Sequence, residues 1–446
     1  MNADPTKLIK TYSHNSIPSL KNLSTTSEQK IELNETIVDV DKSKTNPSEE
    51  GPPPDKGYAW VILGATFINL IFGFGTFNAF GVFQTYYLTV IFVDVPAGQI
   101  AWISTLCVFF TLGGGLTAGP IISKLGLRYT SILGSCIAFV GLILASFSTK
   151  VWQLALTQGV IFGYGCSLIV NVNVTVTALW FEKHRGLALG VAVSGGGFGA
   201  LVLVPVVTKM TALSGIAWGF RTLGMLYFVC TFAGGMFLKP RTGFALTNKI
   251  LDFKLIKDPI TILICMIGFT FQIGFTIPVL YFPASLVGMG VSTNLSTNLI
   301  MLFCSCSVVC RIAAGYLARR FKPVDIAIIF QSISAISILG IWYTSKSFGH
   351  SLAFYIVFGF FSASYIPLGP VIISNHYKKE KISQANGLLN LFVGLATLVG
   401  APSVGAVFQK YGKRTDYSQI IVIGGVSYLI SVAFIIALKY YTRKSN

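Results

Sequence analysis

Charged residues are scarce in this sequence. They make up only 11% of the 446 residues, whereas a soluble domain carries about 25%. Hydrophobic residues account for 53% of the chain, and its mean hydropathy is +0.70. This deficit excludes a surface that faces water over most of its area. The chain is therefore expected to lie largely within a membrane.

Acidic residues are scarcer still beyond the first 56 positions. That segment holds nine of the sixteen acids and is poor in aromatic residues. It cannot bury enough apolar surface to offset its chain entropy, so residues 1–56 are predicted to form a disordered cytoplasmic tail. The other acids lie in predicted loops or at span ends: Asp94, Glu182, Asp252, Asp258, Asp325, Glu380 and Asp416. No carboxylate is thus placed to relay a proton inside the membrane.

Enzyme motifs and metal-ligand spacings are also missing. The sequence has no Walker loop, Gly-x-Ser-x-Gly elbow or His-Glu-x-x-His motif. Its eight cysteines fall inside apolar runs, and none shows metal-ligand spacing with a histidine. The net charge of +17 comes from short clusters between apolar runs, which argues against nucleic acid. We expect no enzyme activity, cofactor or metal, and the sequence indicates no particular protein partner.

Long apolar runs are the dominant positive feature. A helix needs roughly 20 mostly apolar residues to cross a bilayer. Twelve runs of this kind are present, beginning near Tyr58, Ala97, Tyr129, Trp152, Leu187, Trp218, Pro259, Asn298, Val324, Leu352, Gln384 and Ser418. The sequence therefore predicts an all-α membrane protein with twelve transmembrane helices.

The basic residues predict how these helices are oriented. If the tail is cytoplasmic, 18 Lys and Arg residues lie in inside loops and at the C-terminus, against 7 in outside loops. Cytoplasmic loops carry such an excess in membrane proteins. Both termini are therefore expected in the cytoplasm. The plasma membrane is the expected location, with the vacuolar membrane as the alternative.

The two parts of the chain repeat one another. Four residues recur 197 positions later, pairing Ala188 with Ala385, Gly190 with Gly387, Gly197 with Gly394 and Pro205 with Pro402. We predict two pseudo-symmetric six-helix halves, residues 57–238 and 258–440. A cytoplasmic linker, 239–257, joins them, and residues 441–446 form a cytoplasmic C-terminus. Such halves suit an alternating-access transporter with its site near the midplane between them.

Three segments carry a resemblance to known transporters. The segment from Gly119 to Arg128 resembles the signature loop of the major facilitator superfamily. The segments 55–60 and 180–195 resemble the two signatures of the monocarboxylate porter family, in particular a fungal branch that includes riboflavin carriers. The resemblance implies a major facilitator fold. It also implies signature or gating roles for Asp55, Gly57, Trp60, Gly119, Arg128, Arg185 and Gly190.

Arg311 is the most informative residue inside a predicted span. It precedes Arg319 by eight residues, about 12 Å of helix, which is long for snorkelling. A lone charge at this depth costs several kcal/mol, so it must face a cavity or a partner. It either binds a substrate carboxylate through its planar fork or clamps a backbone carbonyl of a neighbouring helix. The resemblance favours the first role, since the family uses an eighth-span arginine for its anionic substrate.

Two positions depart from the pattern of proton-coupled members of that family. Ser307 stands where they have an aspartate, and Asn78 stands where they have a first-span lysine. We therefore expect facilitated diffusion and not tight proton coupling. Other polar residues within spans are expected to line the cavity or to bond between helices: Asn171, Asn173, Gln272 and Tyr365.

The sequence thus predicts a facilitative carrier, embedded in the lipid bilayer, for a small organic solute. The solute is most simply a monocarboxylate, and riboflavin is the alternative. Riboflavin is neutral at pH 7, so its carrier would need no proton site. A nutrient receptor that keeps the fold without transporting is the less favoured third reading.

Overall fold

The computed structural model describes residues 52–241, 253–345, 347–413 and 416–445. Within these ranges the chain is helical and contains no β-strand. Most of the predicted tail and residues 242–252 of the predicted linker lie outside them. The following description concerns the described residues alone.

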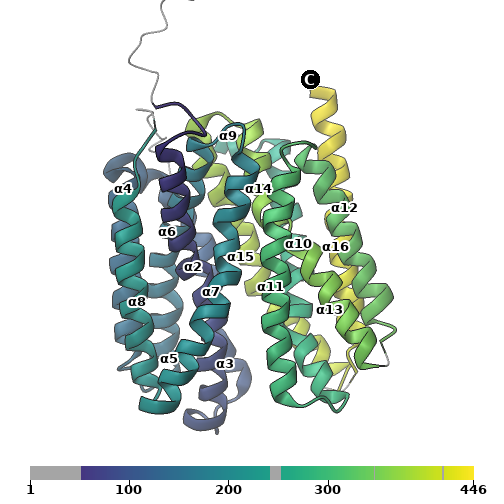
Figure 1. Cartoon of the computed structure of the whole chain (residues 1–446). Coiled ribbons are helices and arrows are strands. Elements are labelled where there is room, and N and C mark those ends of the chain that lie inside the picture. Colours follow the sequence, from purple (N-terminus) through teal and green to yellow (C-terminus); the bar gives the residue numbers. More distant parts are fainter. Residues whose placement is uncertain (1–51, 242–252, 346, 414–415, 446) are drawn as a thin grey trace, which may run out of the picture. The chain divides into compact units, whose positions relative to one another are not determined.

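Residues up to 237 form one set of helices, shown in purple to teal in Figure 1. The helices are α2 (Tyr58–Tyr86, continued by η2, Tyr87–Ile91), α3 (Ala97–Gly113), η3 (Gly114–Thr117), α4 (Ala118–Ala145), α5 (Val151–Leu154), η4 (Ala155–Ile161), α6 (Phe162–Trp180), α7 (Arg185–Ser214) and α8 (Ile216–Phe237). We call this set the N-half.

A second set, the C-half, follows the short helix α9 (Phe253–Ile256). Its helices are α10 (Pro259–Gly288), α11 (Thr293–Leu317), α12 (Pro323–Ile336), η5 (Ser337–Trp342), α13 (Phe348–Ser362), α14 (Tyr365–His376), α15 (Lys379–Lys410) and α16 (Ser418–Ser445). Figure 1 shows α16 ending at the same end of the bundle at which α2 begins. We call this end the tail side.

The number of membrane spans agrees with the sequence prediction. Eleven continuous stretches among the described residues are long and apolar enough to cross a membrane. The longest, Gly98–Ala145, has 48 residues, about 72 Å of helix and twice the thickness of a hydrocarbon core. It breaks at Gly126, whose φ of 80° and ψ of 166° suit glycine and few other residues. This stretch therefore supplies two spans, which brings the described residues to twelve spans, and the chain is an integral membrane protein.

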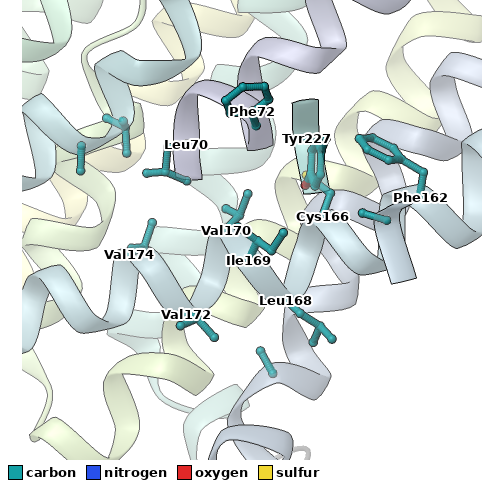
Figure 2. Packing of buried hydrophobic residues seen from close by; sticks show 14 of the residues in the cluster. Leu70, Phe72, Phe162, Cys166, Leu168, Ile169, Val170, Val172, Val174 and Tyr227 are labelled. Carbon is teal, nitrogen blue, oxygen red and sulfur yellow. The ribbon is translucent and has the colours of Figure 1, made fainter. Parts of the chain in front are cut away.

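Each half packs around its own aromatic core. In the N-half, Phe83 stacks on Phe220 with ring centroids 4.0 Å apart, and Figure 2 shows the buried residues around α6. In the C-half, Phe282 lies 4.4 Å from Tyr355. Large side chains thus fill the interior of each half.

Glycines bring the two halves together at the tail side. A Cβ on Gly190 of α7 would lie 2.5 Å from the carbonyl oxygen of Arg311 in α11. A Cβ on Gly387 of α15 would lie 3.0 Å from the carbonyl oxygen of Gly115 in η3. Real Cβ atoms are not found 2.5 Å from a backbone oxygen, so only glycine permits the approach at Gly190. At Gly387 a side chain would be tighter than in ordinary contacts.

The later part of α15 contacts its own half instead. A Cβ on Gly400 would meet Ile273 of α10, and one on Gly405 would meet Tyr281 of the same helix. The described contacts between the halves therefore gather towards the tail side. A site between the halves would therefore be accessible from the side of the membrane opposite to the tail side.

Candidate functional site

Arg311 reaches across the contact between the halves. Its Nη1 donates a hydrogen bond of 2.8 Å to the carbonyl oxygen of Val193 in α7. Gly196 leaves room for the guanidinium, since a Cβ there would lie 3.1 Å from Nη1. The Nε of Arg311 is buried and has no hydrogen-bond partner among the described residues. The side chain thus makes a carbonyl clamp and still keeps a donor for another acceptor.

No carboxylate of the described part of the chain lies beside Arg311. Glu182 pairs with Arg241 at 2.7 Å, and Asp325 pairs with Lys439 at 2.7 Å, both at the tail side. Asp94 and Asp416 lie in loops at the opposite side. A buried guanidinium without an acidic partner is costly. An anionic or carbonyl-bearing solute would supply the acceptors that the protein does not.

The repeat assigns a counterpart to this contact. An offset of 196 pairs Arg311 with Gly115, and an offset of 197 pairs Val193 with Asn390. The amide of Asn171 fills the space where Gly115 lacks a side chain. Its Oδ1 accepts a hydrogen bond of 3.4 Å from Nδ2 of Asn390 in the C-half. One side of the contact is therefore bridged by a cation and the other by two amides.

Polar atoms without partners accompany both bridges. Asn386, one turn before Asn390, is 2% exposed, and neither atom of its amide has a hydrogen-bond partner among the described residues. Ser307, about one turn before Arg311, is also 2% exposed, and its Oγ is likewise unpaired. An unpaired buried polar group costs about 1–3 kcal/mol. The contact between the halves is therefore not optimised as a permanent core.

Sequence reasoning missed Asn386 and Asn390. The repeat offset held the signal, because it pairs Asn390 with Val193 on the helix that faces Arg311.

The other predicted substrate residues divide into two groups. Asn78 is exposed and follows Phe74 by one helical turn, and the Cβ of Phe74 lies next to Gly196 beside Arg311. Asn78 therefore lies on the side of α2 that leads to the guanidinium. The remaining three residues bond within one half.

Asn173, Gln272 and Tyr365 make those intra-half hydrogen bonds. Asn173 accepts one of 3.0 Å from Asn69 of α2. Gln272 donates to hydroxyls of its own half at 3.1 and 3.2 Å. Tyr365 is 2% exposed and donates to the carbonyl oxygen of Ile264 at 3.1 Å. In this conformation these three side chains stabilise a half and do not bridge the two.

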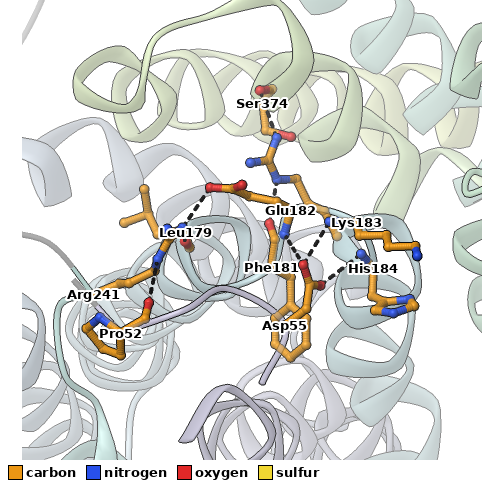
Figure 3. Close-up of polar contacts among 10 residues, drawn as sticks. Pro52, Asp55, Leu179, Phe181, Glu182, Lys183, His184, Arg241 and Ser374 are labelled. Carbon is orange, nitrogen blue, oxygen red and sulfur yellow. Dashed lines mark hydrogen bonds and ion pairs between the residues drawn. The ribbon is translucent and has the colours of Figure 1, made fainter. Parts of the chain in front are cut away.

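The predicted signatures meet at the tail side (Figure 3). The carboxylate of Asp55 accepts hydrogen bonds from the backbone N–H groups of Glu182, Lys183 and His184 at 3.2, 2.9 and 2.9 Å. Partial burial alone would raise the pKa of Asp55, but these three donors and the nearby His184 outweigh it. The pKa therefore lies below its usual value, and Asp55 caps the turn that leads into α7 as an anion.

Aromatic rings complete the docking of the first signature on the second. Trp60 lies edge-on to Phe181 with centroids 5.5 Å apart, and Tyr58 lies 5.7 Å from Trp180. Gly57 has a φ of 54°, which permits the turn between Asp55 and α2. Two segments more than 120 residues apart in the sequence thus form one tail-side cluster.

Arg185 connects this cluster to the other half. Its Nε donates to the carbonyl oxygen of Phe181 at 2.9 Å, and its Nη1 donates to the carbonyl oxygen of Ser374 in α14 at 3.1 Å. Gly119 also lies at the contact, since a Cβ there would be 3.7 Å from Ser383 and Gln384 of α15. Arg128, in contrast, is half-buried just beyond the break at Gly126, and its Nε is unpaired within the described residues.

A family model described as Major Facilitator Superfamily matches residues 62–348 and 264–446. The MFS transporter asaE of Aspergillus flavus is 27% identical over 406 residues, covering 90% of this chain and 91% of that protein. The MFS-type transporter opdF of Penicillium oxalicum is 28% identical over 413 residues (90% and 96%). The fujikurins efflux protein of Gibberella fujikuroi is 27% identical over 401 residues (89% and 86%).

Solved structures share the fold at low sequence identity. The proton:xylose symporter XylE matches with a TM-score of 0.69 and 15% identity, over 85% of this chain and 95% of that one. The transporter FucP in its outward conformation matches with a TM-score of 0.66 and 14% identity, over 86% and 99%. Both likenesses concern the arrangement of helices.

Proposed function

Because the chain belongs to the major facilitator superfamily, whose members compared above are membrane transporters, we propose that it carries a small organic solute by alternating access. The solute site lies between the N-half and the C-half, for which the sequence predicts the bounds 57–238 and 258–440. The halves separate alternately at the tail side and at the opposite side. Unpaired polar atoms between the halves support this, because they lower the cost of separation. The glycine contacts let the two halves meet closely when the tail side is closed.

Arg311 is the observation that carries the proposal. Its guanidinium lies between the halves, has an unused donor and has no acidic partner among the described residues. Arginine binds a carboxylate through two parallel hydrogen bonds that lysine cannot reproduce. In the transport cycle the solute competes with the carbonyl of Val193 for this side chain. Asn78, Ser307, Asn171 and the newly identified Asn386 and Asn390 supply neutral polar contacts around it.

Transport proceeds without tight coupling to protons. The acids of the described segments lie in loops or at helix ends, and none lies at mid-membrane depth. Ser307 and Asn78 carry no titratable group. A carrier without an internal carboxylate moves its solute down the gradient of that solute.

A monocarboxylate is the first candidate solute, because Arg311 offers one cationic fork and no second charge. Riboflavin is the alternative, with its ring carbonyls as acceptors for the same nitrogen atoms. The relative named for fujikurin efflux supports a second direction, the export of an organic product of the cell. A non-transporting receptor is less favoured, since unpaired polar atoms between the halves suit a contact that opens.

Both termini face the cytoplasm in this proposal, and the plasma membrane is the preferred location over the vacuolar membrane. The excess of basic residues in the tail-side loops supports this orientation. The contacts between the halves then favour a state that is closed towards the cytoplasm.

Reconstitution in liposomes tests the substrate and the role of Arg311 together. Uptake of labelled lactate and of labelled riboflavin is measured for the wild type, Arg311→Ala and Arg319→Ala. Arg319 is exposed at the tail side and serves as the matched control. We expect one solute to be taken up, with a loss of about tenfold or more in Arg311→Ala, the scale of a charged hydrogen bond, and little change in the control. If Arg311→Ala took up the transported solute as fast as the wild type, the role of Arg311 in solute binding would be contradicted.

A further inference from the structure

A groove runs along the outer face of the N-half between α2 and α8. It has a volume of about 470 Å³ and is lined by Val61, Gly64, Ala65, Ile68, Val229, Cys230, Ala233, Gly234 and Phe237. These residue types are all apolar or small. Val61, Ile68, Val229 and Phe237 are 44–62% exposed, as expected for side chains that face lipid. The groove is separate from the contact between the halves.

The walls of the groove are preformed. A Cβ on Gly64 would meet no atom within 4 Å, so the side of α2 that it occupies is open space. Gly234 on α8 packs against the amide of Asn69, which closes the floor of the groove towards the core. At the tail-side end, Tyr58 donates a hydrogen bond of 2.8 Å to the carbonyl oxygen of Phe237 and holds the two helices together.

Two lysines flank the tail-side ends of the helices that form the groove. Lys56 precedes α2, Lys239 follows α8, and both are exposed. The Nζ of Lys239 lies 5.0 Å from the centre of the Tyr58 ring, directly beyond the end of the groove. Arg241, by comparison, is already paired with Glu182. Two lysines thus lie near the tail-side end of an apolar groove, and the residues that line this groove include no acid.

The depth of this end in the bilayer follows from Trp60. Its side chain is 51% exposed next to the first groove residue, Val61. Exposed tryptophans of membrane proteins concentrate at the level of the lipid headgroups. From Val61 to Ile68 the helix rises about 10 Å. The groove therefore begins at headgroup level and extends into the region of the acyl chains.

We propose that this groove binds one acyl chain of an anionic phospholipid, whose phosphate is contacted by Lys239 and Lys56. The apolar lining takes a hydrocarbon chain in preference to water, and basic residues between helices at the membrane surface bind anionic headgroups. A zwitterionic lipid can enter the groove but gains less from the two lysines. The lipid joins α2 to α8 beside Tyr58, a member of the tail-side cluster.

Native mass spectrometry of the purified full-length protein tests this site. The delipidated protein is titrated with phosphatidylserine and with phosphatidylcholine of identical acyl chains. We expect one phosphatidylserine to bind more tightly than phosphatidylcholine in the wild type. Lys56→Gln together with Lys239→Gln should weaken phosphatidylserine roughly fivefold for each lysine, because a basic residue near an anionic surface contributes about 1 kcal/mol.

A second variant tests the groove itself. Gly64→Leu places a side chain in open space and should abolish the tight site for both lipids. Two variants are the controls and should bind as the wild type. Gly340→Leu is also exposed, and a Cβ there would meet only the side chain of Ile336, at 4.0 Å. Lys322→Gln is also exposed at the tail side. Equal affinity for the two lipids in the wild type would overturn the headgroup assignment. Unchanged binding in Gly64→Leu would overturn the groove.

Discussion

Arg311 and the asparagines opposite it show how the same structural position can carry different chemistry in the two halves. Arg311 contributes a charge that one carbonyl oxygen only partly satisfies. Asn171 and Asn390 contribute a weak amide contact of 3.4 Å. A solute that displaces both contacts meets strong donors on one side and amides that can donate or accept on the other.

Replacing Asn386 by leucine should stabilise the protein in its tail-side-closed state. The change removes a buried amide that has no hydrogen-bond partner among the residues the structure describes, so the expected gain is of the order of 1 kcal/mol. The expected results are a higher melting temperature and slower transport, measured by thermal unfolding and by liposome uptake.

Asn173→Leu is the matched control for that change. Its amide bonds to Asn69 and to the carbonyl oxygen of Ile169 at 3.0 and 2.8 Å, so its loss should lower the melting temperature. A lower melting temperature for both variants would contradict this prediction, because it would show that the amide of Asn386 makes hydrogen bonds in the membrane.

Asp55 should stabilise the tail-side cluster at neutral pH and lose this effect only in strong acid. Its pKa in the folded protein is depressed, so the contribution is fully present above the ordinary value of about 3.9 and is lost as the pH falls through the lower folded value. Asp55→Asn should therefore lower the melting temperature by a constant amount between pH 5 and pH 8.

Asp94→Asn provides the comparison for Asp55, because Asp94 is exposed in a loop at the opposite side. It should leave the melting temperature unchanged over the same pH range. An effect of Asp55→Asn that grows steadily from pH 5 to pH 8 would contradict the depressed pKa.

At the scale of the helices, α7 and α11 can pack closely because the glycines at their contact have no side chain. Gly190→Val would place a side chain against the backbone of Arg311 and should force the halves apart at the tail side. The expected result is a longer distance between spin labels at positions 183 and 320, which are exposed on opposite halves.

Gly288→Val controls for the loss of a glycine in a helix, because a Cβ there meets no atom within 4 Å. This variant should keep the wild-type distance. An unchanged distance in a folded Gly190→Val protein would show that α7 and α11 do not set the closure.

Much of the helical architecture could be predicted from the sequence, whereas the side-chain partners could not. Apolar length determines the number of spans. The offset between repeated residues predicts two halves, and the bounds of these halves stay a prediction. Asn171 and Asn173 looked alike in the sequence, yet two residues rotate a helix by about 200°. One therefore faces the C-half, and the other faces α2.

The hydrogen-bond partners of Asp55 also could not be predicted from the sequence. The composition around Asp55 predicts the end of the tail, whereas its three backbone partners lie more than 120 residues away in the sequence. Local composition does not report such a partner. The resemblance identified both signatures, but only the three-dimensional structure shows that one docks on the other.

For the whole molecule, the central claim is that two halves move a solute between them without a proton relay. The absence of acids from the interior of the described helices and the position of Arg311 between the halves lead to the same expectation. The solute should equilibrate across the membrane and not be concentrated.

Solute accumulation in liposomes with and without an inward proton gradient tests this claim most directly. For the transported solute, lactate or riboflavin, the account predicts that the internal concentration rises to the external value and stops there. The plateau should be the same in both conditions, and Arg311→Ala should reach it more slowly. Accumulation above the external concentration that depends on the proton gradient and is lost in Arg311→Ala would contradict the account.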